Sequence, residues 1–165
     1  MRIIGIDPGT ALLGFGVIDA DNDPELVDFG AVETVVGVPM PDRLLSLYDA
    51  ITALIARYQP DVMSIEQLFF ARNVTTAITV GQARGVALLA AAQAKLVVVE
   101  YTPSQVKHAI AGYGKADKQQ MQEMVRILLG MEYVPHPDDA ADALAVALCH
   151  AQRRRFAELT QLEAE

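Results

Sequence analysis

Two kinds of apolar pattern alternate along the chain: short runs rich in β-branched residues, and longer segments in which apolar residues return every three or four positions. The short runs predict buried strands, and the longer segments predict amphipathic helices. The predicted strands cover approximately Arg2–Asp7, Leu13–Asp19, Leu26–Val36, Val62–Glu66 and Leu96–Tyr101. The predicted helices cover approximately Pro41–Tyr58, Val74–Lys95, Thr102–Ala111, Asp117–Leu129 and Asp138–Phe156.

The order of these elements predicts the fold class. The first three strands follow one another through short turns such as Asp7-Pro8-Gly9, which favours antiparallel pairing. Helices separate the last two strands, which favours parallel pairing. We therefore predict an α/β protein with a mixed five-stranded sheet, three antiparallel strands and then two parallel ones, and helices on both faces. Residues 1–156 are assigned to a single domain, and the charged residues 157–165 are expected to be a disordered tail.

Composition adds a cellular setting to this picture. The chain is 52% apolar with a mean hydropathy of +0.25, which excludes a disordered protein. No charge-free stretch exceeds 11 residues, whereas a bilayer span needs about 20. We expect no secretory signal, because the first apolar run lacks a basic lead. The single cysteine, Cys149, cannot form an internal disulfide or a cysteine-based zinc site. These features predict a cytoplasmic protein.

The net charge of −8 would, taken as an average, argue against a nucleic-acid partner. The charge is unevenly spread, however. Residues 67–131 carry 7 basic and 3 acidic side chains, whereas residues 1–66 carry 3 basic and 11 acidic ones. The basic middle could form a basic surface on an acidic protein, or it could mix with the acidic ends on the folded surface and cancel. Charge alone leaves both possibilities open.

Two carboxylates end predicted strands. Asp7 follows the first apolar run, and Glu66 follows the fourth. If these strands are parallel neighbours, the two side chains lie about 4.8 Å apart, where they repel each other unless a divalent cation lies between them. The alternatives are that Asp7 only initiates the turn before Pro8 and that Glu66 only reaches water at the end of its strand.

The last predicted helix begins with further acidic residues. Asp139 and Asp142 lie three positions apart and share a helix face. Helix capping and the helix dipole explain Asp138 and Asp139, but they explain Asp142 less well, because it lies one turn in among small apolar residues. Combined with the strand-end carboxylates, these residues predict a site for Mg²⁺ or Mn²⁺ that suits two-metal phosphodiester hydrolysis.

Four motifs carry a resemblance to a known family over about residues 1–150. They are Ile4–Thr10, Glu66–Asn73, Gly81–Gly85 and Asp139–Ala145. In this order and spacing they closely resemble the RuvC family of Holliday junction resolvases, which are crossover junction endodeoxyribonucleases of the ribonuclease H-like superfamily. The resemblance implies a single ribonuclease H-like nuclease domain over residues 1–156.

The resemblance also implies an activity and its components. It implies resolution of four-way DNA junctions by paired symmetric nicks in two opposing strands, in homologous recombination and DNA repair. It further implies two Mg²⁺ ions per active site, for which Mn²⁺ can substitute, and a homodimer. The implied partner is a branch-migration motor of the RuvA and RuvB type in the bacterial nucleoid. The catalytic metal ligands that it selects are Asp7, Glu66, Asp139 and Asp142, which leaves Asp138 to helix capping.

Several further side chains could contact DNA. Phe69 and Phe70 are adjacent and cannot both face one core, and the resemblance favours Phe69 as the aromatic that stacks on or wedges between bases. Arg72 and Asn73 are then expected to contact the DNA backbone or bases. The alternative is that the two phenylalanines pack in the core.

Three lysines surround a glycine-rich loop and are the remaining DNA-binding candidates. The resemblance places Lys107 and Lys118 near the scissile phosphate, where they would also act in catalysis, and Lys115 is expected to bind DNA. The alternative is that all three are solvated surface lysines. The basic run Arg153–Arg155 suits an exposed helix end and is not assigned to DNA.

Two glycines lie four positions apart within one predicted helix. Each costs the helix roughly 1 kcal/mol relative to alanine, so Gly81 and Gly85 indicate the close approach of another backbone. That backbone belongs either to the sheet or to a second protomer. A two-fold dimer would present two identical sites to the two equivalent phosphates of a four-way junction.

Two other classes of protein compete with a resolvase. A sugar-kinase or chaperone-type ATPase of the same superfamily also uses a strand followed by an Asp-x-Gly-Thr turn, but it needs two such domains and more than 165 residues. A non-catalytic junction-binding module would not need all four acidic residues.

Overall fold

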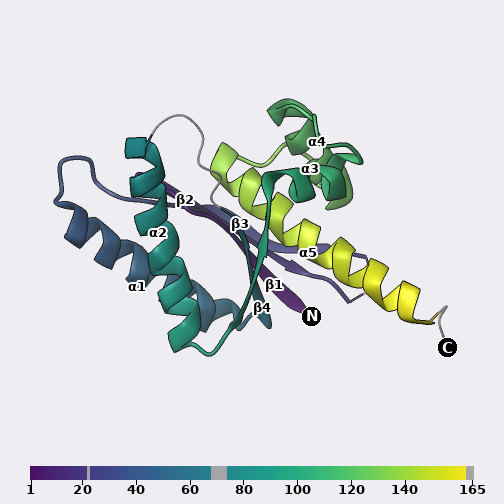
Figure 1. Cartoon of the computed structure of the whole chain (residues 1–165), viewed down its shortest axis with the longest axis horizontal. Coiled ribbons are helices and arrows are strands. Elements are labelled where there is room, and N and C mark those ends of the chain that lie inside the picture. The colour runs from purple at the N-terminus through teal and green to yellow at the C-terminus, as the bar shows by residue number, and fades with distance from the viewer. Residues whose placement is uncertain (22, 68–73, 163–165) are drawn as a thin grey trace.

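The structure is a computed structural model that describes residues 1–21, 23–67 and 74–162. Its five strands form one sheet in the order β3-β2-β1-β4-β5 (Figure 1). Strands β1, β2 and β3 pair antiparallel, whereas β4 pairs parallel to β1 and β5 pairs parallel to β4. The predicted mixed sheet is therefore confirmed. The strands are β1 Arg2–Asp7, β2 Leu12–Asp19, β3 Glu25–Glu33, β4 Val62–Glu66 and β5 Val97–Tyr101.

Helices cover both faces of the sheet, as predicted. Helices α1 and α2 lie together on one face, while α5 runs diagonally across the other and carries α3 and α4 on its outer side (Figure 1). None of the helices in the described part of the chain is long and apolar enough to cross a membrane. The helices are α1 Met40–Tyr58, α2 Val74–Gln93, α3 Pro103–Ala111, α4 Lys118–Leu128 and α5 Asp138–Leu162.

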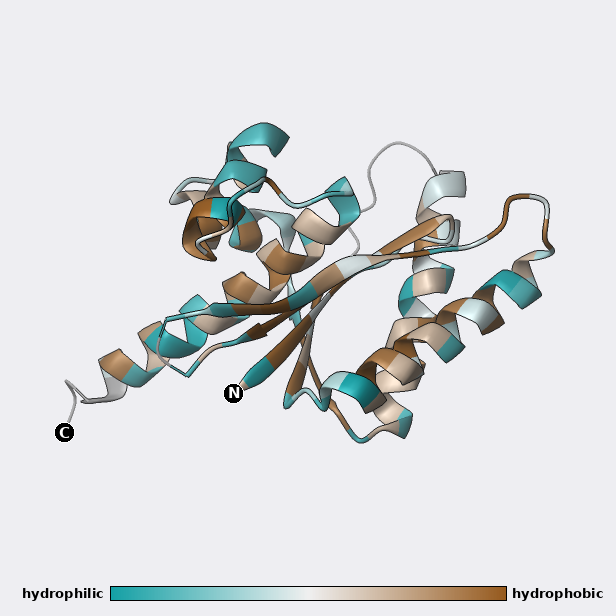
Figure 2. Ribbon diagram, turned by 180° about the vertical axis from the view of Figure 1, so that it is seen from behind, coloured by the Kyte–Doolittle hydropathy of each residue, from teal (hydrophilic) through white to brown (hydrophobic). Residues whose placement is uncertain are grey.

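Alternate residues of the strands supply two separate hydrophobic cores. Ile4 and Ile6 of β1 face α1 and α2, where they pack in one cluster with Leu47. Ile3 faces the other side and packs in a second cluster with Leu144 of α5. Hydrophobic residues accordingly follow the strands, while hydrophilic ones gather on the outward turns of the helices (Figure 2). Strand alternation thus fixes which face of the sheet each helix covers.

Strand glycines let α5 lie directly on the backbone of the sheet. A Cβ atom added to Gly14 of β2 would lie 1.9 Å from the carbonyl oxygen of Asp139, and one added to Gly5 of β1 would lie 2.0 Å from that of Ala143. From β4, the buried Ser64 hydroxyl donates a hydrogen bond of 2.8 Å to the carbonyl oxygen of Val146. The first turns of α5 are therefore held against the centre of the sheet, beside the ends of β1 and β4.

The two helices that pack on the outer side of α5 begin with capping boxes. Thr102 accepts a hydrogen bond from the backbone N–H of Gln105 and starts α3, and Asp117 does the same with Gln120 to start α4. Such caps satisfy backbone donors that the first turn of a helix leaves free. They fix the start of the two helices that carry Lys107 and Lys118.

Two predicted boundaries were wrong. Strand β3 ends at Glu33, not at Val36, because its partner strand begins at Leu12, the residue that pairs with Glu33. The following valines, Val35 and Val36, are therefore exposed in the loop that leads to α1.

At the other end of the chain, α5 continues to Leu162, beyond its predicted end at Phe156. An ion pair between Arg154 and Glu158, four positions apart, supports the added turns. The part of the expected disordered tail up to Leu162 is thus helical, and residues 163–165 lie outside the described residues. The assignment of residues 1–156 as the domain stays a prediction.

Candidate active site

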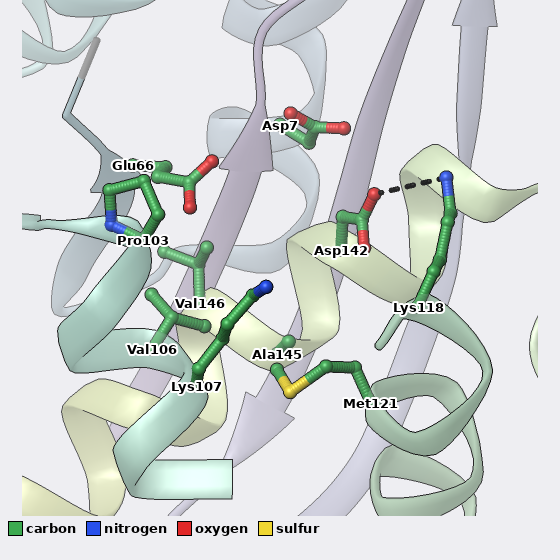
Figure 3. Close-up of a pocket in the computed structure, with 10 residues that line it drawn as sticks. All are labelled: Asp7, Glu66, Pro103, Val106, Lys107, Lys118, Met121, Asp142, Ala145 and Val146. Carbon is green, nitrogen blue, oxygen red and sulfur yellow. Dashed lines mark ion pairs between the residues drawn. The ribbon is translucent and has the colours of Figure 1, made fainter. Parts of the chain in front are cut away.

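One pocket gathers five of the predicted site residues at the carboxyl ends of β1 and β4 (Figure 3). Its volume is about 200 Å³. The carboxylates of Asp7, Glu66 and Asp142 point into it, as does the ammonium of Lys107, and Lys118 reaches Asp142 at its edge (Figure 3). The apolar wall comes from α3, α4 and α5 and consists of Pro103, Val106, Met121, Ala145 and Val146.

The parallel pairing of β1 and β4 explains the first half of the site. Ile6 pairs with Ile65, so the next residues along, Asp7 and Glu66, leave the sheet side by side. Asp142 joins them from the second turn of α5, which the strand glycines hold against the sheet. The sequence prediction that the two strand-end carboxylates meet the start of the last helix agrees with this geometry.

Burial, together with the charges of neighbouring acidic residues, raises the pKa values of these carboxylates. Burial, followed by the charges of Asp142, Asp139 and Glu66, raises the pKa of Asp7 from 3.8 to about 7. Burial and the charge of Asp142 also raise the pKa of Glu66, although Lys107 opposes the shift. Burial raises the pKa of Asp142, against the lowering effect of Lys118. The pocket therefore favours a cation or a proton.

The chemistry of this donor set fits a hard divalent cation. Mg²⁺ and Mn²⁺ take carboxylate oxygens and water as ligands, and a cation removes the repulsion that raises the pKa of Asp7. Within the described residues, no three Asp, Glu, His or Cys side chains stand close enough together to hold an ion as they are oriented. For three of these carboxylates to share an ion, their side chains would have to move closer together.

Asp139 takes part in the site through its charge. It is half-buried in the first turn of α5, where its backbone carbonyl lies against Gly14. Its side chain is not part of the pocket lining, but its charge raises the pKa values of Asp7 and Asp142. Asp139 thus acts electrostatically on Asp7 and Asp142 without lining the pocket.

Lys118 forms ion pairs with two of the carboxylates at the start of α5. Its Nζ lies 3.0 Å from Oδ2 of Asp138 and 3.6 Å from Oδ2 of Asp142. Burial would lower the pKa of Lys118, but the hydrogen bond with Asp138 and the charges of both carboxylates raise it. The same ammonium lowers the pKa of Asp138. Lys118 therefore stays charged beside the pocket.

Asp138 does more than its capping assignment suggested. It is the first residue of α5, where its charge suits the helix dipole, but both of its carboxylate oxygens contact α4. Oδ1 accepts a hydrogen bond of 2.9 Å from the amide of Gln122, and Oδ2 pairs with Lys118. The nearby N–H groups of Ala140 and Ala141 bond to the carbonyl of Pro137.

The remaining DNA-binding candidates lie apart from the pocket or outside the described residues. Lys115 is exposed in the loop between α3 and α4 and does not line the pocket. The other four, Phe69, Phe70, Arg72 and Asn73, lie outside the described residues.

The surroundings of Gly85 test whether the sheet accounts for the helix glycines. Gly85 is exposed on α2, and a Cβ atom placed there would meet nothing within 4 Å. The sheet therefore does not account for Gly85. Gly81 is half-buried, one turn earlier. The exposed face of α2 that includes Gly85 also carries Ile78 and Leu89, whose exposed fractions are 58% and 54%.

Arg84 supports the site, although the sequence suggested no role for it. This side chain, 16% exposed, reaches from α2 to form an ion pair of 2.7 Å with Glu100 of β5. Its Nε also donates a hydrogen bond of 3.4 Å to the carbonyl oxygen of Glu66. The feature of the sequence that could have indicated a role for Arg84 was its position within the Gly81–Gly85 motif. The strand glycines Gly5 and Gly14 were missed too, although glycine inside a strand indicates close backbone approach.

A mixed sheet of this order, with acidic groups at the ends of β1 and β4 and at the start of the last helix, defines a nuclease of the ribonuclease H-like class. The family model described as crossover junction endodeoxyribonuclease RuvC matches residues 3–150. The chain therefore belongs to the RuvC family.

Individual relatives agree with this assignment. The crossover junction endodeoxyribonuclease RuvC of Chloroflexus aggregans is 62% identical over 152 residues, which cover 92% of this chain and 93% of the relative. The structure of T. thermophilus RuvC in complex with a Holliday junction substrate superposes with a TM-score of 0.90 at 37% identity, covering 95% of this chain and 96% of the other. A yeast mitochondrial Holliday junction resolvase, at 12% identity and a TM-score of 0.63, shares the fold; the match covers 97% of this chain and 85% of the other.

Proposed function

We propose that this protein is a metal-dependent endonuclease that resolves four-way DNA junctions by paired symmetric nicks, in homologous recombination and DNA repair. Family membership supports the class of activity. The observation that carries the proposal is the convergence of Asp7, Glu66 and Asp142 with two lysines in one pocket. This pocket lies at the carboxyl ends of β1 and β4. A passive binding module does not need this combination, and a kinase-like ATPase needs two such domains and more than 165 residues.

The acidic residues of the pocket would hold the metal ions. We assign two Mg²⁺ ions per site, with Mn²⁺ as a substitute, to Asp7, Glu66, Asp139 and Asp142. Such ions supply an activated water and stabilise the leaving oxygen of a phosphodiester. The raised pKa of Asp7 supports the assignment, because carboxylates that repel one another gain most from a shared cation.

The lysines would act on the phosphate. Lys107 and Lys118 line the same pocket as the carboxylates, from α3 and α4. Positive groups placed there neutralise the phosphate and stabilise the charge that develops during displacement. The apolar wall that includes Val106 and Met121 strengthens these interactions, because it limits the access of water.

The substrate assignment extends from the relatives to this chain. A relative at 37% identity was solved with a Holliday junction, and its structure overlays nearly the whole of this one. We therefore assign four-way junction DNA as the substrate. Contacts to it are proposed for Lys115 and for the residues outside the described part, Phe69, Phe70, Arg72 and Asn73.

A homodimer formed through α2 would match the symmetry of the junction. The exposed face with Ile78, Gly85 and Leu89 has the apolar character and small central residue that close helix packing needs. Two-fold symmetry would present two identical pockets to two equivalent phosphates. The proposal includes a branch-migration motor of the RuvA and RuvB type as partner, and a cytoplasmic, nucleoid-associated location.

Gel analysis of a synthetic four-way junction tests the proposed function. With Mg²⁺ we expect two nicks at symmetric positions in opposing strands, and with EDTA none. Asp7→Asn should reduce cutting by about a thousand-fold or more and leave junction binding in EDTA within about two-fold, because it removes a metal ligand and no DNA contact. Asp49→Asn, an exposed change on α1, is the matched control and should cut like the wild type.

Each arm of this experiment has an outcome that contradicts the proposal. Binding without nicks in Mg²⁺ would favour a non-catalytic junction-binding module. Loss of junction binding in Asp7→Asn, with a normal melting temperature, would show that Asp7 serves DNA binding and not metal-dependent chemistry.

A further inference from the structure

The contact between α4 and the first residue of α5 is built around one carboxylate, that of Asp138. Lys118 and Gln122 lie one helical turn apart on α4, and each binds a different oxygen of Asp138, at 3.0 Å and 2.9 Å. Asp138 is thereby held in a fixed orientation by two donors. Neither the metal set nor the helix cap requires this arrangement.

Lys118 has freedom that such a contact can restrict. Its backbone is fixed by the capping box of Asp117, but its side chain is 56% exposed and has four rotatable bonds. A free lysine at this position would sample many rotamers. An exposed ion pair adds little to the stability of a protein. The main effect of the contact with Asp138 is therefore on the position of the Lys118 ammonium and not on the stability of the fold.

Asp142 cannot replace Asp138 in this role once metal ions are bound. The ammonium is 3.6 Å from Asp142, one of the proposed metal ligands (Figure 3). An ion held by Asp142 would use the same carboxylate and repel the ammonium. Asp138 lies outside the proposed metal set, so it remains as an anionic partner that keeps Lys118 beside the pocket.

We propose that Asp138 is a positioning residue, which holds the Lys118 ammonium against the scissile phosphate while divalent ions occupy the neighbouring carboxylates. The proposal rests on the proposed function, since it concerns the same cleavage reaction. Asp138 itself touches neither the metal ions nor the DNA. It acts through Lys118, and its effect should disappear when Lys118 no longer carries a charge.

The test is single-turnover cutting of a synthetic four-way junction in Mg²⁺. Asp138→Asn keeps the size of the side chain and an acceptor for Gln122 but removes the charge. We expect cutting to slow by about ten-fold, because a misplaced charged group loses much of its effect on the transition state. Junction affinity in EDTA should change by less than about two-fold, and Asp138→Glu should recover part of the lost rate.

A double-mutant cycle separates positioning from a structural role. In a Lys118→Met background, Asp138→Asn should cause no further loss of rate, because the group that it positions is gone. Glu123→Gln is the matched control, since it removes another ion pair of α4, with Arg126, away from the pocket. This control should cut at the wild-type rate.

The outcomes separate a failure of the proposed function from a failure of the positioning role of Asp138. If the wild type does not nick the junction in Mg²⁺, the proposed function fails. If the wild type nicks it and Asp138→Asn is equally fast, only the positioning role is overturned. The positioning role is also overturned if Asp138→Asn slows the Lys118→Met enzyme by the same factor as the wild type, because the effect would then not pass through Lys118.

Discussion

At the scale of single residues, Asp7 is the most strongly perturbed acid of the pocket. Its carboxyl group is buried at the end of the central strand, and three other carboxylates act on it. In a metal-free protein this arrangement favours the protonated form. The protonation of Asp7 therefore links the acidic pocket to the stability of the fold.

The raised pKa of Asp7 predicts that the metal-free protein loses stability as pH rises. Between pH 3.8 and about 7, the folded protein holds a proton that the unfolded chain has released. The proton favours the folded state at the acidic end of this window, and the advantage is lost as pH approaches 7. The effect on the free energy of unfolding is at most about 4 kcal/mol, at about 1.4 kcal/mol per unit of pKa.

Urea unfolding in EDTA, at pH values from about 5 to about 8, measures this effect. Asp7→Asn is the comparison, because it removes the titrating group and keeps the other titrations, including that of His150, which acts in the opposite direction. We expect the advantage of Asp7→Asn over the wild type to grow as pH rises. A difference that stays constant with pH would contradict the prediction.

The convergence of the main acidic residues could be predicted from the sequence, but the partners of Lys118 could not. Asp7, Glu66 and Asp142 each interrupt an apolar pattern. A carboxylate within an apolar segment is expected to have a binding partner, and this expectation follows from the sequence alone. The contact between Lys118 and Asp138 depends on how α4 packs on α5, because the two residues are 20 positions apart in the sequence. Helix capping is a sufficient local explanation for Asp138, so the sequence gives no signal for the tertiary contact.

At the scale of elements, the position of α5 depends on glycine in the strands beneath it. Gly14 meets the backbone of Asp139, which cannot move aside without shifting the helix. The close contact between α5 and the sheet therefore sets how near Asp139 and Asp142 come to Asp7.

Gly14→Ala is expected to destabilise the protein by about 3 kcal/mol or more, because the added methyl group would overlap a backbone carbonyl at 1.9 Å. Chemical denaturation measures the loss. Gly30→Ala on β3 is the matched control, because its Cβ meets only ring atoms of Phe15 at 3.0 Å, and a side chain can shift. Equal stability of the two variants would show that α5 can move away from the sheet at little cost.

The direction of the strands could be predicted because short turns favour antiparallel pairing and intervening helices favour parallel pairing. The end of β3 could not, since Val35 and Val36 favour a strand by their side chains while the partner strand is absent beyond Leu12. The last turns of α5 show the opposite difference, since this helix is longer than predicted. Polar residues there form a helix because α5 is already long, and pairs such as Arg154 with Glu158 extend it.

At the scale of the whole molecule, the ion pairs bear on the question of charge that the sequence left open. Several basic groups of the middle segment are ion-paired within the protein: Arg84 with Glu100, Arg126 with Glu123, and Lys118 with Asp138 and Asp142. The net positive charge of residues 67–131 is therefore partly neutralised locally. For the binding of a phosphate group, the lysines close to the pocket are more important than the net charge of residues 67–131.

The exposed face of α2 leads to a prediction about assembly. Gly85→Arg should leave the fold intact, because nothing in the protomer lies within 4 Å of an added Cβ, but it should block close packing of a second copy. Analytical ultracentrifugation should show a shift from dimer to monomer, with at least about a hundred-fold weaker association. Paired nicks in a junction should become unpaired single nicks.

Ala53→Arg, on the exposed side of α1, is the matched control and should leave the mass and the pairing of nicks unchanged. A Gly85→Arg protein that stays dimeric would place the dimer interface elsewhere. A wild-type protein that is monomeric at micromolar concentration would overturn the symmetric dimer itself.

The chain has one cysteine, Cys149, which lies on α5 and is fully buried. Burial raises the pKa of its thiol to about 11, so almost none of it is thiolate at neutral pH. The native protein therefore offers a nearly silent background for maleimide chemistry. A fluorophore attached to a cysteine introduced at a surface position would label that position alone, and distances within a protein–junction complex could be followed by energy transfer without removing the natural residue.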